Sequence, residues 1–216
     1  MFISRSDWGA REPRATTQID STANIVIHYE GNESAGDVNA VQAIQNYHMD
    51  RNGWNDIAYS FLINQNGDIY EGRGWGLRSA ANGSVATNRD RYAICFLIGA
   101  DTPPSELALQ AARDLISMAR GAVENPRDIT GHRDHIATSC PGQPLYDLIQ
   151  TGAFEPDFGQ VFINDVPVVE NVPAPNPLAE LADGVLSVGE SGVWVKILQE
   201  RLISLGFDVG PAGAVS

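Results

Sequence analysis

The feature that most constrains the fold is an uncharged apolar run, Tyr92–Gly99 (YAICFLIG). A run this short, with β-branched and aromatic residues, is typical of a buried strand. Asn24–Tyr29 (NIVIHY) has the same character, and Ala58–Asn64 and Asp68–Glu71 form two further strand-like segments. Between these last two lies Gln65-Asn66-Gly67, where Asn-Gly strongly favours a tight turn. The sequence therefore predicts a sheet of several short strands.

Two segments with helical periodicity lie among these strands. Asp37–Arg51 begins with Asp37 as a candidate N-cap, and Pro103–Ala122 begins with prolines that suit a first helical turn. In each segment, residues at helical spacing fall on one face of the expected helix. They are Val38, Val41, Ile44 and His48 in the first, and Leu107, Ala111, Leu115 and Ala119 in the second. Strands interspersed with helices predict the α/β fold class, with a single mixed β-sheet flanked by helices.

The composition changes at Glu155. Residues 1–154 are evenly mixed and form the predicted first domain, whereas residues 155–184 carry five prolines without periodicity and are typical of a linker. Residues 185–216 contain one short amphipathic pattern ended by Gly206, which cannot bury its apolar face alone. We therefore expect a catalytic-sized domain, a Pro-rich linker and a partial C-terminal module.

The charge balance excludes several classes of partner. With 27 acidic and 14 basic residues, the formal net charge of −13 opposes binding to nucleic acid or to an anionic membrane. No apolar stretch approaches the ~20 residues of a membrane-spanning helix. The N-terminal stretch lacks the pattern of a signal peptide, so we expect synthesis in the cytoplasm and no membrane insertion.

The cysteines and histidines carry the chemical signal. Cys95, within the apolar run, is best explained as a core residue, and His48 as a buried helix histidine. Cys140 lies in a polar turn eight residues after His132, and His28 ends a predicted strand. Imidazole and thiolate are preferred zinc ligands, and three protein ligands plus water make the catalytic arrangement. On spacing alone, a zinc site and a free cysteine beside a surface histidine are equally supported, and His135 is a weaker rival ligand.

A resemblance to a known family resolves this choice. The segments SRSDWGAR, IVIHY, IQNYHMDRNGWNDIAYSFLINQNGDIYEGRGWG and DITGHRDHIATSCPGQPLYDLI occur in order between Arg5 and about Ile149. They resemble the peptidoglycan recognition protein and type-2 N-acetylmuramoyl-L-alanine amidase family, which includes phage lysins. The resemblance implies a mixed sheet with a zinc cleft on one side. By position, it also implies Zn²⁺ as cofactor, held by His28, His132 and Cys140.

The same resemblance assigns further residues. DIAY stands where the family has DIGY, so Tyr59 is expected to stabilise the oxyanion, with Thr138 as a second catalytic residue. Tyr29 replaces a second histidine that is frequent in the family, which changes substrate contact. Gly53, Trp54 and Arg73 match positions that accompany diaminopimelate-type substrate, whose extra carboxylate a guanidinium can bind bidentately.

Two departures from the family pattern bear on mechanism. The strand YAICFLIG lacks the general-base glutamate of some relatives, and SAANGSVATNRDR replaces a GAHT-like stretch. Zinc-activated water with Tyr59 is therefore expected to suffice. In the C-terminal segment, Leu198-Gln199 and Leu205-Gly206 resemble the first half of a peptidoglycan-binding module.

The resulting prediction is a zinc amidase that cuts between muramic acid and L-alanine in bacterial peptidoglycan, as a phage endolysin or other lytic enzyme. Without a signal peptide, it would reach the cell wall through holin-type release. Two alternatives remain: a receptor that binds wall fragments without catalysis, and a cysteine peptidase using Cys140 with His132. Chelation separates the last, because a thiol peptidase survives metal removal.

Overall fold

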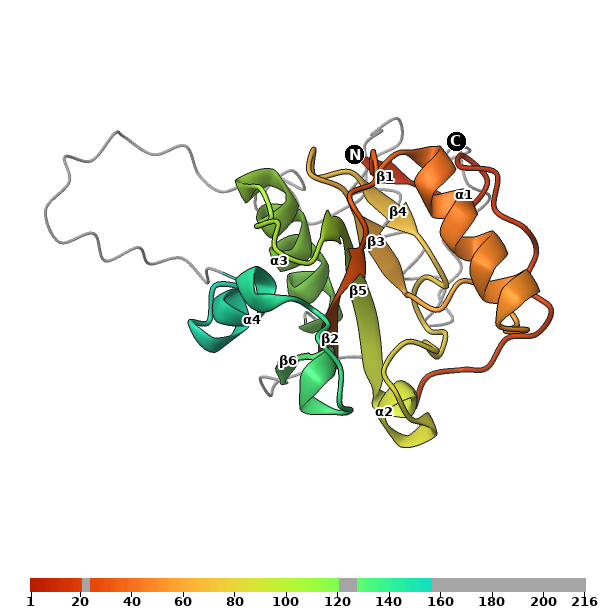
Figure 1. Ribbon diagram of the computed structural model, residues 1–216. Coiled ribbons are helices and arrows are strands. Elements are labelled where there is room, and N and C mark those ends of the chain that lie inside the picture. The colour runs from red at the N-terminus through yellow and green to blue at the C-terminus, as the bar shows by residue number, and fades with distance from the viewer. Residues whose placement is uncertain (21–23, 121–127, 157–216) are drawn as a thin grey trace, which may run out of the picture. The chain divides into compact units, whose positions relative to one another are not determined.

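The computed structural model describes residues 1–20, 24–120 and 128–156. Within them, a six-stranded sheet has the order β1-β4-β3-β5-β2-β6 (Figure 1). The strands are β1 (Phe2–Ile3), β2 (Asn24–Gly31), β3 (Phe61–Ile63), β4 (Ile69–Glu71), β5 (Arg91–Gly99) and β6 (Ile129–Gly131). Neighbouring strands are parallel except β3 and β4, which form the antiparallel pair expected around Asn66-Gly67. The predicted mixed sheet is confirmed.

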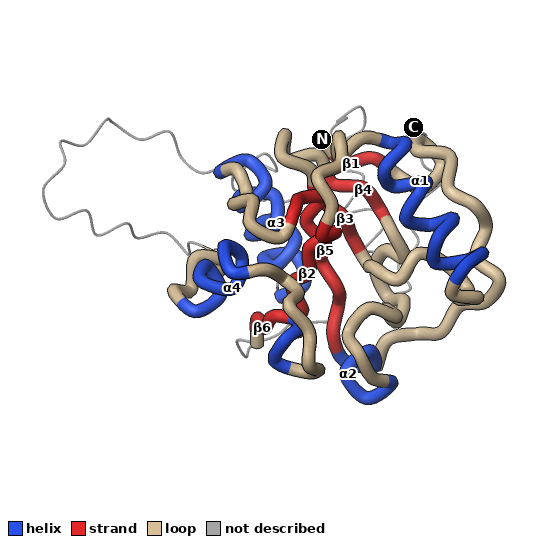
Figure 2. The backbone as a smooth tube through the Cα atoms, in the orientation of Figure 1, coloured by secondary structure: helices blue, strands red, loops and turns tan. Residues whose placement is uncertain are grey.

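Helices cover both faces of this sheet (Figure 2). They are α1 (Val38–Asn46), α2 (Val85–Asp90), α3 (Glu106–Arg120) and α4 (Gln143–Gln150), with a π-helical turn η1 (Tyr47–Arg51) and a 3-10 turn η2 (His132–Asp134). Val41 of α1 packs with Cys95 and Leu97 of β5 in one buried cluster. Phe96, which points the other way along β5, contacts Phe154 after α4. The strand β5 is therefore buried on both faces, as its uncharged sequence predicts.

The helix boundaries differ from the prediction in two places. Asp37 caps α1 as expected, with its carboxylate accepting from the Ala40 amide at 3.0 Å, but the last turn of the predicted helix is η1. The prediction that prolines occupy the first turn of the second helix is wrong. Pro103 and Pro104 precede α3, and the Ser105 hydroxyl accepts from the Ala108 amide instead. Proline lacks an amide hydrogen, and serine is a better cap.

The contacts between residues divide the chain into two units, Met1–Pro156 and Asp157–Ser216. The predicted linker beyond Pro156 and the predicted C-terminal module lie outside the described residues. In the part of the chain that is described, no helix is both long and apolar enough to cross a membrane.

Candidate metal centre

Two parallel neighbouring strands bring the two histidines together. Ile27 of β2 pairs with Gly131 of β6, and the next residues along the two strands are His28 and His132. Their ring centroids lie 4.5 Å apart. His28 is also in register with Cys95 on β5, so its side chain lies on the face that α1 covers. Sheet register alone therefore pairs two imidazoles that are far apart in the sequence.

Cys140 completes a three-residue cluster with them, which we term the metal cluster. His28, His132 and Cys140 each offer one nitrogen or sulfur atom, and these atoms lie within 4.8 Å of one another. The Cys140 Sγ is 3.6 Å from the His28 Nδ1. The His132 Nε2 is buried without a hydrogen-bond partner, a costly arrangement unless a ligand satisfies it. Two imidazoles, one thiolate and an orphaned buried nitrogen fit a zinc ion.

The electrostatics of the metal cluster favour the ligating forms of its histidines. Burial, with a smaller effect from His132, lowers the pKa of His28 to about 3, and burial lowers the pKa of His132. Both rings are therefore neutral at pH 7, with a lone pair available. Burial raises the pKa of the Cys140 thiol to about 12, so its thiolate requires a cation beside it.

The loop that carries Cys140 is fastened to η2. The Arg133 amide donates to the Cys140 carbonyl at 2.9 Å, and the Arg133 guanidinium donates to the Ser139 carbonyl at 2.7 Å while lying 4.5 Å above the Tyr146 ring. The Thr138 Oγ1 accepts from the Cys140 amide at 3.3 Å. Cys140 is consequently only 8% exposed, although its sequence context is a polar turn. His135, the rival ligand, instead pairs its Nε2 with the Thr130 hydroxyl at 2.9 Å.

Two tyrosines border the metal cluster. The half-buried Tyr59 ring lies 5.4 Å from the His28 ring. Burial, followed by the nearby Cys95 and Cys140 thiols, raises the pKa of Tyr59 well above its ordinary value, so its hydroxyl stays protonated and can donate. The Tyr29 hydroxyl lies 3.1 Å from the Ser139 hydroxyl, which links β2 to the Cys140 loop.

One carboxylate near this site was not predicted from the sequence. Glu30, two residues after His28, is half-buried, and burial raises its pKa. Its charge also contributes to the raised pKa of Tyr59. Its position in β2, two residues after a candidate ligand, was the available signal.

A second group, the flank cluster of His48, Trp54 and Arg73, lies beyond Tyr59. The His48 ring is 5.6 Å from Tyr59 and 4.9 Å from Trp54, which is 39% exposed. The His48 Nδ1 accepts from the Ala58 amide at 3.1 Å. Gly53 next to Trp54 has a φ of +72°, which glycine adopts without strain, and a Cβ there would meet no atom within 4 Å.

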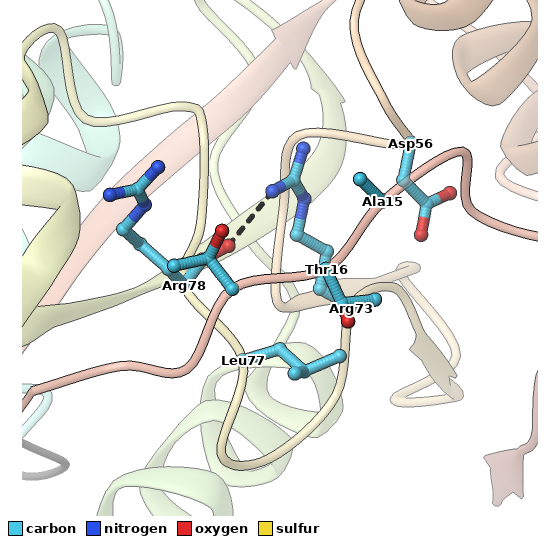
Figure 3. Close-up of a pocket in the computed structure, with 7 residues that line it drawn as sticks. Ala15, Thr16, Asp56, Arg73, Leu77 and Arg78 are labelled. Atoms are coloured by element: carbon cyan, nitrogen blue, oxygen red, sulfur yellow. Dashed lines mark hydrogen bonds between the residues drawn. The ribbon is translucent and has the colours of Figure 1, made fainter.

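Arg73 is already engaged by the protein backbone. Its Nε donates to the Ile57 carbonyl at 2.7 Å, and its Nη1 donates to the Arg78 carbonyl at 2.9 Å. Figure 3 shows the second of these bonds in a small pocket. The pocket is lined by Ala15, Thr16, Thr17, Asp56, Arg73, Leu77 and Arg78. The metal ligands do not line it, so the pocket beside Arg73 is separate from the metal cluster.

Comparison with known proteins places this arrangement in a family. Residues 19–143 match the profile described as N-acetylmuramoyl-L-alanine amidase. Peptidoglycan-recognition protein SC2 of Drosophila melanogaster is 35% identical over 158 residues, covering 69% of this chain and 85% of that protein.

Two solved structures are also similar. Wild-type Drosophila PGRP-LB aligns with a TM-score of 0.65 and 30% identity, covering 77% of this chain and 99% of that one. Peptidoglycan recognition protein-LE, solved with tracheal cytotoxin, a monomeric diaminopimelic acid-type peptidoglycan, aligns with a TM-score of 0.64 and 32% identity, covering 69% and 92%. The fold and site define an α/β domain with a His-His-Cys centre. The chain belongs to the N-acetylmuramoyl-L-alanine amidase family, which it shares with the peptidoglycan recognition proteins.

Proposed function

We propose that this protein is a zinc-dependent N-acetylmuramoyl-L-alanine amidase that hydrolyses the bond between muramic acid and L-alanine in peptidoglycan. The observation that carries the proposal is the metal cluster itself, with His132 Nε2 buried and unpartnered beside His28 and Cys140. Peptidoglycan as the substrate is supported by relatives named as peptidoglycan recognition proteins and by a neighbour solved with a peptidoglycan fragment.

Zinc, when bound, supplies a Lewis acid that polarises the scissile carbonyl and lowers the pKa of a water molecule. His28, His132 and Cys140 would hold it, which is the three-ligand set of catalytic zinc sites. Tyr59, neutral and beside His28, donates a hydrogen bond to the oxyanion that develops as the amide is attacked. The hydroxyl of Thr138 is a second donor, because its oxygen accepts from the Cys140 amide and leaves its hydrogen available.

The flank cluster suits the stem peptide. Trp54, partly exposed and with its ring 4.9 Å from that of His48, offers an aromatic wall, and the Tyr29 hydroxyl contacts Ser139 of the Cys140 loop. Arg73 is the cation that we assign to the terminal carboxylate of diaminopimelate. Its two bonds to backbone carbonyls fix the plane of the guanidinium, which reduces the entropy lost when the carboxylate binds.

The biological role that we propose is cell-wall lysis of the endolysin type, with access to the wall after holin-type release. This role is supported by the resemblance of the motifs around His28, Tyr59 and Cys140 to a family that includes phage lysins.

One digestion experiment tests the proposed function. Purified peptidoglycan is incubated with the full chain, with and without a chelator, and the new ends are identified by mass spectrometry. An amidase releases stem peptides with a free L-alanine amine, loses activity on chelation and recovers it with zinc. Binding without new ends would instead indicate a receptor, and chelator-resistant cleavage within the peptide would indicate a thiol peptidase.

A further inference from the structure

The second ring nitrogen of His28 makes a buried contact outside the metal cluster. His28 Nε2 lies 2.9 Å from the Oδ1 of Asn82, and the two residues are 1% and 0% exposed. Asn82 comes from SAANGSVATNRDR, the segment in which this chain departs from the family pattern. The contact therefore joins a metal ligand to a part of the sequence that has no assigned role.

The orientation of the Asn82 side chain follows from its other partners. Its Nδ2 donates to the Arg91 carbonyl at 3.1 Å and to the Ser79 Oγ at 2.9 Å. A carbonyl can only accept, so the amide nitrogen must face Arg91 and the amide oxygen must face His28. The Ser79 hydroxyl donates to Asn88 Oδ1 at 2.9 Å, which leaves its lone pairs for Asn82. Asn88 Oδ1 also accepts from the Asn82 backbone amide at 2.9 Å, so both the backbone and the side chain of Asn82 are held by hydrogen bonds.

The orientation of this amide determines which nitrogen of His28 carries the hydrogen. An amide oxygen has no hydrogen to give, so Nε2 must donate to it. A neutral imidazole has one ring hydrogen, and the lone pair therefore lies on Nδ1. That atom is the one that faces the Cys140 Sγ, at 3.6 Å.

We propose that Asn82 is a positioning residue of the metal centre, which holds His28 in the Nε2–H tautomer and aims its Nδ1 lone pair at the metal ion. The proposal rests on the zinc site proposed above. Metal-ligating histidines commonly donate their other N–H to a carboxylate or carbonyl oxygen, and loss of such a partner weakens metal binding. Here a side-chain amide fulfils this role, and the Ser79–Asn88 bonds hold the amide in place.

The first test measures zinc affinity and zinc-free stability on the same full-chain variants. Asn82→Leu removes the acceptor and keeps the branching of the side chain at Cγ, and we expect zinc to bind about 10–100-fold more weakly in competition with a chromophoric chelator. Ser79→Ala is the matched control, because it removes a bond to Asn82 but keeps the Oδ1 contact with His28. The zinc affinity of this control should lie within about threefold of the wild-type value, because Ser79 does not contact a metal ligand.

Asn82→Asp supplies a rescue. A carboxylate keeps an oxygen acceptor for His28 but loses the donors to Ser79 and Arg91, so zinc affinity should recover relative to Asn82→Leu while the zinc-free fold is less stable. A purely structural role predicts the opposite dependence, with zinc affinity following fold stability across all three variants. That result, or wild-type zinc affinity in folded Asn82→Leu, would overturn the proposal.

The second test needs neither zinc nor activity. Long-range ¹H–¹⁵N spectra of the zinc-free protein report which ring nitrogen of each histidine is protonated. We expect His28 of the wild type as a single Nε2–H tautomer, and a tautomer mixture in Asn82→Leu. An Nδ1–H tautomer in the wild type would refute the role of Asn82 while leaving amidase activity untouched. Conversely, absence of zinc binding in the wild type would refute the proposed function and not the tautomer assignment.

Discussion

The metal cluster and the flank cluster both border Tyr59, and they differ in how their polar atoms are satisfied. In the metal cluster, His132 Nε2 is buried with no hydrogen-bond partner, and the pKa of the Cys140 thiol is raised to about 12, so the thiol is not ionised at pH 7. In the flank cluster, His48 accepts from a backbone amide, and Arg73 donates to two backbone carbonyls. The first group is incomplete without a ligand, whereas the second is already part of the fold.

This difference determines what substitutions should do. Replacing Cys140 of the metal cluster takes away binding energy that only the metal complex realises, so function falls while the zinc-free fold changes little. Removing a residue from the flank cluster also breaks bonds that hold the fold, so function and stability fall together.

The largest effect is expected for Cys140→Ser. A hydroxyl is a far poorer zinc ligand than a thiolate at neutral pH, so zinc affinity and amidase activity should each fall by well over 100-fold. This loss exceeds the one expected when a ligand only loses its hydrogen-bond partner. Zinc content by elemental analysis and peptidoglycan digestion check this, with Cys95→Ala as the control cysteine. A fully active, metal-free Cys140→Ser protein would remove the metal cluster from the mechanism.

Tyr59→Phe should separate turnover from metal binding. Its hydroxyl is assigned to the oxyanion and not to the metal, so zinc content and melting temperature should be retained while kcat falls by roughly 10²-fold. Steady-state kinetics on a soluble muropeptide give the split between kcat and KM. If kcat stays at the wild-type value, Tyr59 is a packing residue between the two clusters.

Arg73→Ala should show the mixed pattern of the flank cluster. The preference in kcat/KM for diaminopimelate over lysine muropeptides should shrink by about 1.5–3 kcal/mol, the value of a charged hydrogen bond. Stability should also fall, because the Ile57 and Arg78 carbonyls lose their donor. Arg78→Ala is the control, since Arg78 lines the same pocket. An unchanged substrate ratio together with lowered stability would make Arg73 a structural residue only.

The sequence predicted the metal cluster better than its surroundings. Strand patterns placed His28 in β2, although the strand continues to Gly31 and His28 does not end it. The family motifs indicated His132 and Cys140, and the structure brings the ligand atoms of all three residues within 4.8 Å. The strands β1 and β6 were not predicted, because two- or three-residue strands have too little periodicity to detect. The sheet order was equally inaccessible, since β6 is paired with β2 across more than a hundred residues.

The supporting contacts were the hardest to foresee. Asn82 lies in a segment without helical or strand periodicity, and its role depends on three partners that converge only in the folded chain. The same holds for Arg73, whose motif suggested a free cation but whose guanidinium is bound by backbone carbonyls. Motifs identify residue types that perform chemistry, whereas hydrogen-bond satisfaction requires coordinates.

The smallest effect is expected in the pH dependence of stability and concerns His48 of the flank cluster. Burial, with a further contribution from the Arg73 charge, lowers the pKa of His48 to about 4, while the Asp56 charge opposes the shift. Between the unfolded value of about 6.5 and the folded value, the unfolded chain binds a proton that the folded chain does not. The stability contributed by neutral His48 is therefore complete above about pH 6.5 and is lost as the pH falls to about 4.

His48→Asn tests this directly, because its Oδ1 can accept from the Ala58 amide where His48 Nδ1 does, yet it cannot titrate. Between pH 7 and 4, the free energy of unfolding should fall more in wild type than in His48→Asn, by on the order of 1–3 kcal/mol. Urea unfolding, followed by circular dichroism, measures this difference. A chelator is added to keep both proteins free of zinc at every pH, so that release of zinc from the metal cluster in acid does not contribute. If the free energy of unfolding falls equally with pH in the two proteins, His48 is exposed to water and its pKa is the same in the folded and unfolded chains. The flank cluster would then be an open surface, and its contrast with the metal cluster would be one of charge and not of burial.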